Sequence, residues 1–336
     1  MQIVIVLAAL AIIATSIKFV SWNKSYIDKG MTSTINGFFI TLVFLSHFSQ
    51  YTTWGRNYIG YLLGQLIVVM FLFYSGYGCA MQYMSKGEAY LKTFLKKRVL
   101  LTLLNFDIAV TVFIVVGLLI GKSFSARQIV FSFVCWDSVG NSNWYIFAII
   151  LCYIAFYLSY AMKGLKCANL ARYGGVAILL TILFGIVICL SRVKESYWYD
   201  TIMAFGAGVM YAIHKEEIEA FARKYYWITL SVLLIAFGAI PHLPIIARYH
   251  FVMFNLKSVM FALLIVMVTM KFELRCPVFS WCGRNIFPLY IYQRIPMIVF
   301  SAIWPVAFTN WHSCVYLCLS AAITACIAVI YQKCHC

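Results

Sequence analysis

His47 is the side chain in this sequence best suited to acid–base chemistry in an apolar setting. It lies within residues 35–51, a run in which most side chains are apolar. An ionisable residue is costly to bury in such a run, so it marks a candidate functional site. A neutral imidazole can act there as a general base. The alternative is a structural histidine that hydrogen-bonds to a neighbouring helix.

Arg294 lies inside a second apolar run, residues 285–307, among three prolines. Proline removes a backbone hydrogen bond and frees a carbonyl group, which favours a broken helix that lines a cavity. We therefore expect Arg294 to contact a substrate or a developing negative charge. The other polar or ionisable side chains within apolar runs are Asn36, Ser75, Asn105, Asp107, Asn255, Lys257, Asn285 and Gln293.

A basic segment separates two apolar runs and contains Lys86, Lys92, Lys96, Lys97 and Arg98. Lysine offers a point charge and arginine a planar fork, and both bind phosphate. One interpretation of the segment is therefore a docking surface for a phosphorylated cofactor. The alternative is a topology signal that contacts anionic lipid.

The elements that position these residues must lie in a membrane. Hydrophobic residues make up 64% of the 336 residues and charged residues 11%, with a net charge of +16. A soluble domain contains about a quarter charged residues, so an ordinary soluble enzyme and a disordered chain are excluded. The apolar runs are continuous rather than alternating, which argues against a β-barrel. We find no linker or soluble domain and expect one transmembrane domain over residues 1–336.

A membrane-crossing helix needs about 20 apolar residues. Dividing the chain at charged and turn residues predicts an all-α, polytopic helix bundle with about 10 to 11 spans. These lie near residues 3–20, 35–52, 58–84, 99–120, 143–161, 173–191, 198–213, 225–240, 251–271, 285–307 and 312–332.

The distribution of basic residues predicts the orientation. The first run has no basic residue before it and carries Lys18 and Lys24 at or after its end, unlike a secretory signal peptide. Counted from there, 18 of the 26 Lys and Arg residues fall on one side and six on the other. The basic side is expected to be cytoplasmic, with the N-terminus outside and the C-terminus inside.

The 12 cysteines suggest neither a disulfide framework nor a metal site. Most lie in or beside apolar runs, where cysteine acts as a small hydrophobe. Cys334, His335 and Cys336 do not fit a four-ligand zinc pattern. We therefore expect no bound metal. Since the basic residues are assigned to loops beside a membrane, we also expect no nucleic-acid partner.

Several segments, in order along the chain, resemble acyltransferase family 3, the membrane enzymes that acylate surface polysaccharides. Gly37 and His47 fit the family's early span, although Asn36 replaces its usual basic residue. The further similar segments are residues 71–78, 96–98, 143–146 and 287–296, which cover residues 33–305 together with the early span. Two more positions differ from the family pattern: Leu101 replaces an Arg and Gln293 a His.

This resemblance implies a membrane O-acyltransferase of the cell envelope, with His47 as the catalytic base. Acetyl-CoA, or another acyl-CoA, would be the donor substrate, and no cofactor would be permanently bound. The acceptor would be a hydroxyl of a cell-surface glycan or a lipid-linked sugar, and the location a bacterial inner membrane. The resemblance assigns Lys97, Arg98 and Arg294 to donor binding, and Asn36, Ser75, Trp144 and Gln293 to substrate binding.

Other interpretations remain open at this point. Many spans and a buried arginine also suit a transporter or flippase for lipid-linked sugars. The substitutions at Asn36, Leu101 and Gln293 suit an inactive relative that serves as an assembly partner. Ser75 and Gly76 are typical of a close helix contact, and Trp144 of an aromatic anchor at the membrane surface.

Overall fold

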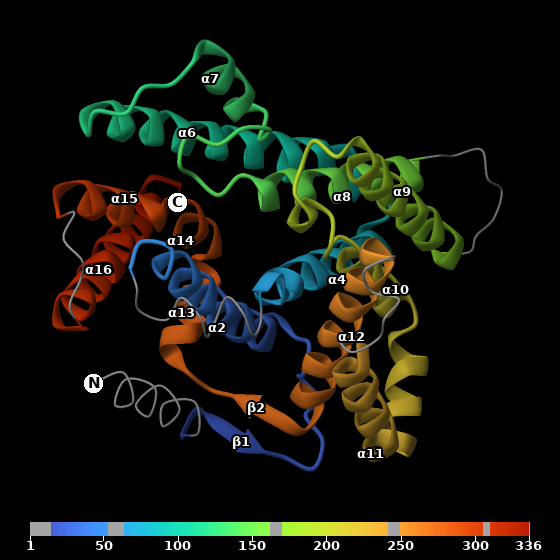
Figure 1. The fold of residues 1–336 in the computed structure, drawn as a ribbon. Coiled ribbons are helices and arrows are strands. Elements are labelled where there is room, and N and C mark those ends of the chain that lie inside the picture. Colours follow the sequence, from blue (N-terminus) through green and yellow to red (C-terminus); the bar gives the residue numbers. More distant parts are fainter. Residues whose placement is uncertain (1–14, 53–63, 162–169, 241–248, 305–309, 336) are drawn as a thin grey trace. The chain divides into compact units, whose positions relative to one another are not determined.

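The computed structural model describes residues 15–52, 64–161, 170–240, 249–304 and 310–335, and these residues are almost entirely helical (Figure 1). Nine helices in this part of the chain are long and apolar enough to cross a membrane. They occupy residues 29–48, 64–86, 88–119, 144–161, 173–191, 215–239, 250–271, 286–303 and 312–334. The predicted all-α membrane fold is confirmed.

The chain divides into two compact units, each made of separate stretches of sequence. Unit 1 (residues 1–67, 105–143 and 269–336) contains β1 (Ile17–Phe19), α2 (Lys29–Phe48), most of α6 (Leu101–Leu119), α7 (Ala126–Phe133), β2 (Phe272–Leu274), α13 (Pro277–Arg284), α14 (Ile286–Tyr292), α15 (Arg294–Ile303) and α16 (Asn310–His335). Unit 2 (residues 68–104 and 144–268) contains α4 (Val69–Lys86), α5 (Glu88–Phe94), a π-helical segment (Leu95–Leu100), α8 (Trp144–Ala161), α9 (Leu170–Ser191), a 3-10 turn (Ser196–Trp198), α10 (Met203–Ile213), α11 (Lys215–Ala239) and most of α12 (His250–Lys271).

In unit 1, α2 packs against α13 at a crossing made by glycines. A Cβ atom at Gly37 would lie 1.6 Å from the carbonyl oxygen of Phe279, and one at Gly283 would lie 1.7 Å from that of Ser33. Only glycine permits this approach of two backbones. The hydroxyls of Thr34 and Ser280 are 2.7 Å apart at the same crossing. Gly37 therefore fixes the position of α2 against α13.

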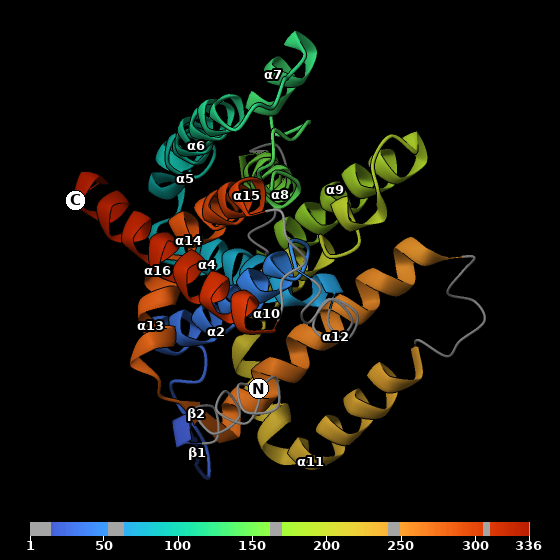
Figure 2. The same ribbon diagram turned by 60° about the vertical axis from the view of Figure 1, so that its left-hand side comes forward.

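In unit 1, a proline interrupts the helical segment of residues 286–303. α14 ends at Tyr292 and α15 starts at Arg294, with Gln293 between them. Pro296 has no N–H for the carbonyl of Tyr292, and its ring would clash with that group in a continuous helix. The predicted helix break is confirmed. Both helices pack on α16 (Figure 2).

The strand β1 corrects the C-terminal end of the predicted first span. We predicted a helix over residues 3–20, of which residues 3–14 lie outside the described part of the chain. Residues 17–19 instead pair antiparallel with β2, with Lys18 opposite Glu273 (Figure 1). Apolar Ile17 and Phe19 alternate with Lys18, which is the period of a strand, and the opposite charges stabilise this register.

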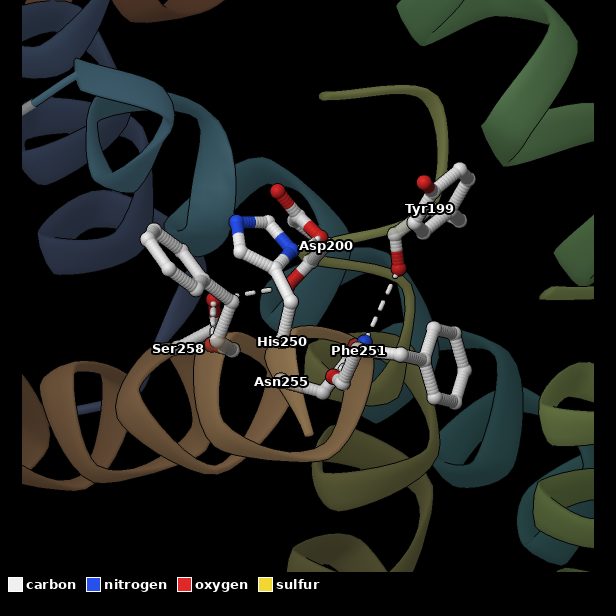
Figure 3. A network of polar contacts seen from close by, with 7 residues as sticks. Tyr199, Asp200, His250, Phe251, Asn255 and Ser258 are labelled. Atoms are coloured by element: carbon white, nitrogen blue, oxygen red, sulfur yellow. Dashed lines mark hydrogen bonds and ion pairs between the residues drawn. The ribbon is translucent and has the colours of Figure 1, made fainter. Parts of the chain in front are cut away.

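The predicted span 198–213 is also corrected, because helix α10 of unit 2 covers only residues 203–213. At 1.5 Å per residue it is roughly half as long as a bilayer core is thick. Asn255 of α12 prevents an earlier helix start: its amide nitrogen donates to the carbonyl of Tyr199 (2.9 Å), and its oxygen accepts from the N–H of Met203 (3.0 Å). Figure 3 shows the bond between Asn255 and Tyr199, together with that from Ser258 to the carbonyl of Asp200 (3.2 Å).

Two predicted loops are helical. Residues 85–98 continue as helix except at Gly87, whose φ of +54° makes the turn between α4 and α5. Residues 215–224 form the first turns of α11. Lys, Glu, Ala and Leu dominate both segments, and these residues have high helix propensity. The basic residues are therefore held on helices.

Candidate active site

His47 occupies the last turn of α2 in unit 1. The helix begins after Asp28, whose side chain accepts a hydrogen bond from the N–H of Met31 (2.8 Å). Asn36 lies 11 residues before His47, close to three full helical turns, so both side chains lie on one face of α2 at a separation of roughly 16 Å. This period explains why the two positions form one motif.

Among the described residues, one side chain lies within hydrogen-bonding distance of the imidazole of His47. Its Nε2 lies 3.4 Å from the hydroxyl of Ser142, and its ring centroid lies 6.5 Å from that of Tyr290. Its Nδ1 has no hydrogen-bond partner among the described residues. No carboxylate in the described ranges pairs with His47, so the site differs from an Asp–His–nucleophile triad.

The turn that carries Ser142 is held by two asparagines. Asn141 accepts hydrogen bonds from the N–H of Val139 (3.1 Å) and the hydroxyl of Ser138 (3.2 Å). Asn143 donates to the carbonyl of Cys135 (2.9 Å). These bonds fix the backbone on both sides of Ser142, and so the hydroxyl that meets His47 is preorganised.

Arg294, the first residue of α15, reaches the end of α2. Its Nε and Nη2 donate to the hydroxyl of Tyr51 (3.1 and 3.0 Å), and Nη2 lies 3.4 Å from Oε1 of Gln50. The guanidinium is close enough to interact electrostatically with both His47 and Tyr290. The structure thus brings together two predicted residues, His47 and Arg294, which are far apart in the sequence.

Gln293 and Asn36 are the two predicted substrate-binding residues of unit 1. Gln293 is fully buried, and its amide nitrogen donates to the carbonyl of Tyr290 (2.9 Å). Its Oε1, and Oδ1 of Asn36, have no hydrogen-bond partner within the described residues. Native structures leave few buried acceptors unpaired, so each of these oxygens is a candidate ligand contact.

The predicted donor-binding residues Lys97 and Arg98 lie in the π-helical segment of unit 2. Such segments are rare and are frequent at functional sites. Lys97 is exposed, whereas Arg98 is partly buried, with its guanidinium carbon 5.9 Å from the ring centroid of Tyr153. The hydroxyl of Ser75 is a hydrogen-bonding neighbour of the same tyrosine. Tyr153 therefore joins two predicted residues.

Trp144 is the first residue of α8, in a different part of unit 2. Its ring lies 5.7 Å from that of Tyr197 and 6.1 Å from that of Tyr145, with edge-to-face geometry. Its position at the start of a membrane-length helix is that of an aromatic anchor.

The alternative interpretation of Gly76, a close helix contact, is confirmed, because a Cβ atom there would lie 2.0 Å from the carbonyl oxygen of Phe205 in α10.

Sequence reasoning did not select Ser142, Tyr51 and Tyr290. Ser142 belongs to the polar stretch of residues 137–143 directly before an apolar run, a signal of a structured turn. Tyr290 lies in the family-like segment 287–296, and this was the signal that could have selected it, whereas Tyr51 gave no local signal beyond its position near His47. Among the described residues, no three His, Cys, Asp or Glu side chains form a metal-binding group.

The nine membrane-length helices among the described residues define a polytopic membrane protein. Residues 34–332 match the family model of the acyltransferase domain, and the chain therefore belongs to acyltransferase family 3. No curated protein and no solved structure has significant similarity to it. The chain is a membrane acyltransferase that transfers groups other than aminoacyl groups, which confirms the resemblance and disfavours the transporter.

Proposed function

We propose that this acyltransferase moves an acyl group from acyl-CoA to a hydroxyl of a cell-surface glycan or its lipid-linked precursor. The observation that carries the proposal is that His47 lies 3.4 Å from the hydroxyl of Ser142 and within electrostatic reach of the charge of Arg294. Acyl transfer to an alcohol needs a base for the alcohol proton and a positive group for the developing oxyanion.

The reaction follows from these two groups. Nδ1 of His47, the ring nitrogen that has no partner among the described residues, takes the proton of the acceptor hydroxyl while the hydroxyl oxygen forms a bond to the thioester carbon. Arg294 stabilises the negative charge on the carbonyl oxygen of the tetrahedral intermediate. The carbon–sulfur bond then breaks, and the CoA sulfur leaves with the proton returned by His47. Ser142 orients the imidazole and is a positioning residue.

The donor is proposed to bind through its phosphates at Lys97 and Arg98. Lys97 is exposed and free to reach a phosphate, and Arg98 is oriented by Tyr153. A mobile lysine and a preorganised arginine together suit the several phosphate groups of CoA.

The acceptor is proposed to enter near the turn that carries Ser142. A pocket of about 440 Å³ in unit 1 is lined by Lys122, Phe124, Gln128 and Ser138, among other residues. Polar groups with one aromatic ring suit a sugar, whose hydroxyls need hydrogen bonds and whose C–H face packs on a ring. Ser138 donates to the carbonyl of Asn141, next to Ser142.

The location is proposed to be a bacterial inner membrane, with the basic segment of residues 86–98 in the cytoplasm. The excess of Lys and Arg on one side supports this orientation. It puts the segment with Lys97 and Arg98 on the side that supplies acyl-CoA, and residues 121–142 on the side of the surface glycan.

The test is the release of free thiol from acyl-CoA by the purified full chain in nanodiscs, with cell-envelope glycan as acceptor. His47→Ala should lower the rate by about 10²–10⁴-fold, the usual contribution of a general base. His214→Ala is the matched control, since His214 pairs with Glu217 in unit 2. An unchanged rate in the His47 variant refutes the role of His47. An inactive wild type supports the inactive relative.

A further inference from the structure

An apolar cavity lies next to the candidate active site within unit 1. It has a volume of about 240 Å³ and is lined by residues of α2, α13, α14 and α16, the break between α14 and α15 included. The lining side chains used below are Ile40, Thr41, Phe44, Leu289, Gln293 and Ala325. The cavity thus lies between helices that meet at the glycine crossing and at the proline break, and it is open on the side of Val278 and Ala321.

Gln293 gives this cavity an unpaired polar group. Its side chain is fully buried, and its orientation is fixed because the amide nitrogen donates to the carbonyl of Tyr290. Its Oε1 is then left without a hydrogen-bond partner among the described residues. A buried amide oxygen in an apolar lining requires a donor, and a ligand can supply one.

Two residues that line the cavity lie close in sequence to residues of the candidate active site. Phe44 lies one helical turn before His47 on α2, and Gln293 directly precedes Arg294. A ligand with its apolar part against Phe44 and its polar part at Gln293 would hold its reactive group beside the imidazole and the guanidinium.

We propose that this cavity holds the acyl chain of the donor and selects chains longer than acetyl. An acyl-CoA carries an apolar tail on the thioester and an amide N–H a short way along the pantetheine arm, which match the lining and the Gln293 oxygen. An apolar cavity of about 150 Å³ is enough for a six-carbon ring, so about 240 Å³ accommodates roughly eight carbons. This inference rests on the proposed transfer from acyl-CoA.

Two alanines of α16 give a matched test. Ala325 lines the cavity, whereas Ala322 is exposed and does not. Thiol release is measured for Ala325→Leu, Ala322→Leu and wild type with acetyl-, butanoyl-, octanoyl- and dodecanoyl-CoA. Wild type should prefer octanoyl-CoA to acetyl-CoA in kcat/KM by about tenfold or more, the discrimination that an apolar pocket provides.

The variants should separate chain length from activity. Ala325→Leu should lose about tenfold or more with octanoyl-CoA and keep its rate with acetyl-CoA, and Ala322→Leu should match wild type. Equal effects of both variants, or a wild type that accepts acetyl-CoA alone, overturn the inference and leave acyl transfer intact. A wild type that consumes no acyl-CoA refutes the proposed function as well.

A binding readout covers the case in which Ala325→Leu fails to fold. The wild-type chain is irradiated with a non-hydrolysable thioether analogue of octanoyl-CoA that carries a diazirine at the end of the chain. Crosslinks to residues 40–44 or 321–325 support the inference, and excess octanoyl-CoA should prevent them. Crosslinks that persist under this competition indicate a lipid-filled groove and overturn it.

Discussion

A single hydroxyl positions the proposed base. Ser142 lies 3.4 Å from Nε2 of His47, and the turn around it is fixed by side-chain hydrogen bonds. The imidazole is the proposed base, but the orientation of its ring depends on Ser142, which lies 95 positions later in the chain.

Removing that hydroxyl should lower kcat and leave KM for acyl-CoA unchanged. A hydrogen bond of this kind contributes about 0.5–1.5 kcal/mol, so Ser142→Ala should cost roughly two- to tenfold. Ser142→Thr, which keeps the hydroxyl, should restore the rate. Ser301→Ala is the control, because Ser301 donates only to the carbonyl of Ile298. A Thr variant as slow as the Ala variant would contradict the positioning role.

Asp200 predicts a pH dependence of stability in unit 2. Its side chain is 1% exposed and lies 3.4 Å from Nδ1 of His250 (Figure 3). Burial raises the pKa of Asp200 from 3.8 to about 7, and a hydrogen bond from Ser196 opposes this rise. Between these two pH values the folded state keeps a proton that the unfolded state has released. The folded state is therefore stabilised at the acidic end, and this stabilisation is lost as pH rises toward 7.

The contribution of Asp200 to the thermal unfolding midpoint of the full chain in nanodiscs should therefore decrease as pH rises from 5 to 7, against an opposite contribution from His250, whose pKa is lowered by burial. Asp200→Asn cannot ionise and should flatten this slope. Glu217→Gln is the control, since Glu217 is exposed. Equal slopes in wild type and Asp200→Asn would show that Asp200 does not carry the effect.

At the scale of the elements, glycines decide how the helices pack. Unit 1 joins α2 to α13 through Gly37 and Gly283, and unit 2 joins α4 to α10 through Gly76 and Gly208. A Cβ atom at Gly208 would lie 2.0 Å from the carbonyl oxygen of Phe73. Lipid tails are as apolar as the side chains, so close backbone packing drives helix association in a membrane.

Two glycines on α4 give a matched pair. Gly76→Ala should destabilise the protein by about 1–3 kcal/mol, because the new methyl group meets the backbone of Phe205. Gly78→Ala has open space within 4 Å and should stabilise the helix by about 0.5–1 kcal/mol. Thermal unfolding in nanodiscs measures both changes. Similar midpoints for the two variants would refute the close crossing.

At the scale of the whole molecule, the basic residues predict the orientation. An epitope tag inserted after Lys122 should be accessible to antibody in intact spheroplasts, and one inserted after Gly87 only after permeabilisation. Thiol release verifies that both tagged proteins are active. The reverse pattern would invert the proposed topology and put Lys97 and Arg98 away from cytoplasmic acyl-CoA.

Hydropathy along the chain was sufficient to predict most of the helices. The span 143–161 and helix α8 agree to within a residue, as do residues 251–271 and α12. The strand β1 and the short α10 were not predicted. Both depend on partners distant in sequence, Glu273 for β1 and Asn255 for α10, which a local pattern does not contain.

The sequence by itself determined the membrane fold, the family and the candidate base His47, because apolar length and motif spacing are properties of consecutive residues. The tertiary structure decided which side chains meet that base. Ser142 and Arg294 reach the end of α2 only through a packed turn and a broken helix, and the cavity beside Gln293 exists only where four helical segments meet. Such contacts depend on which helix faces pack together, and hydropathy does not encode that choice.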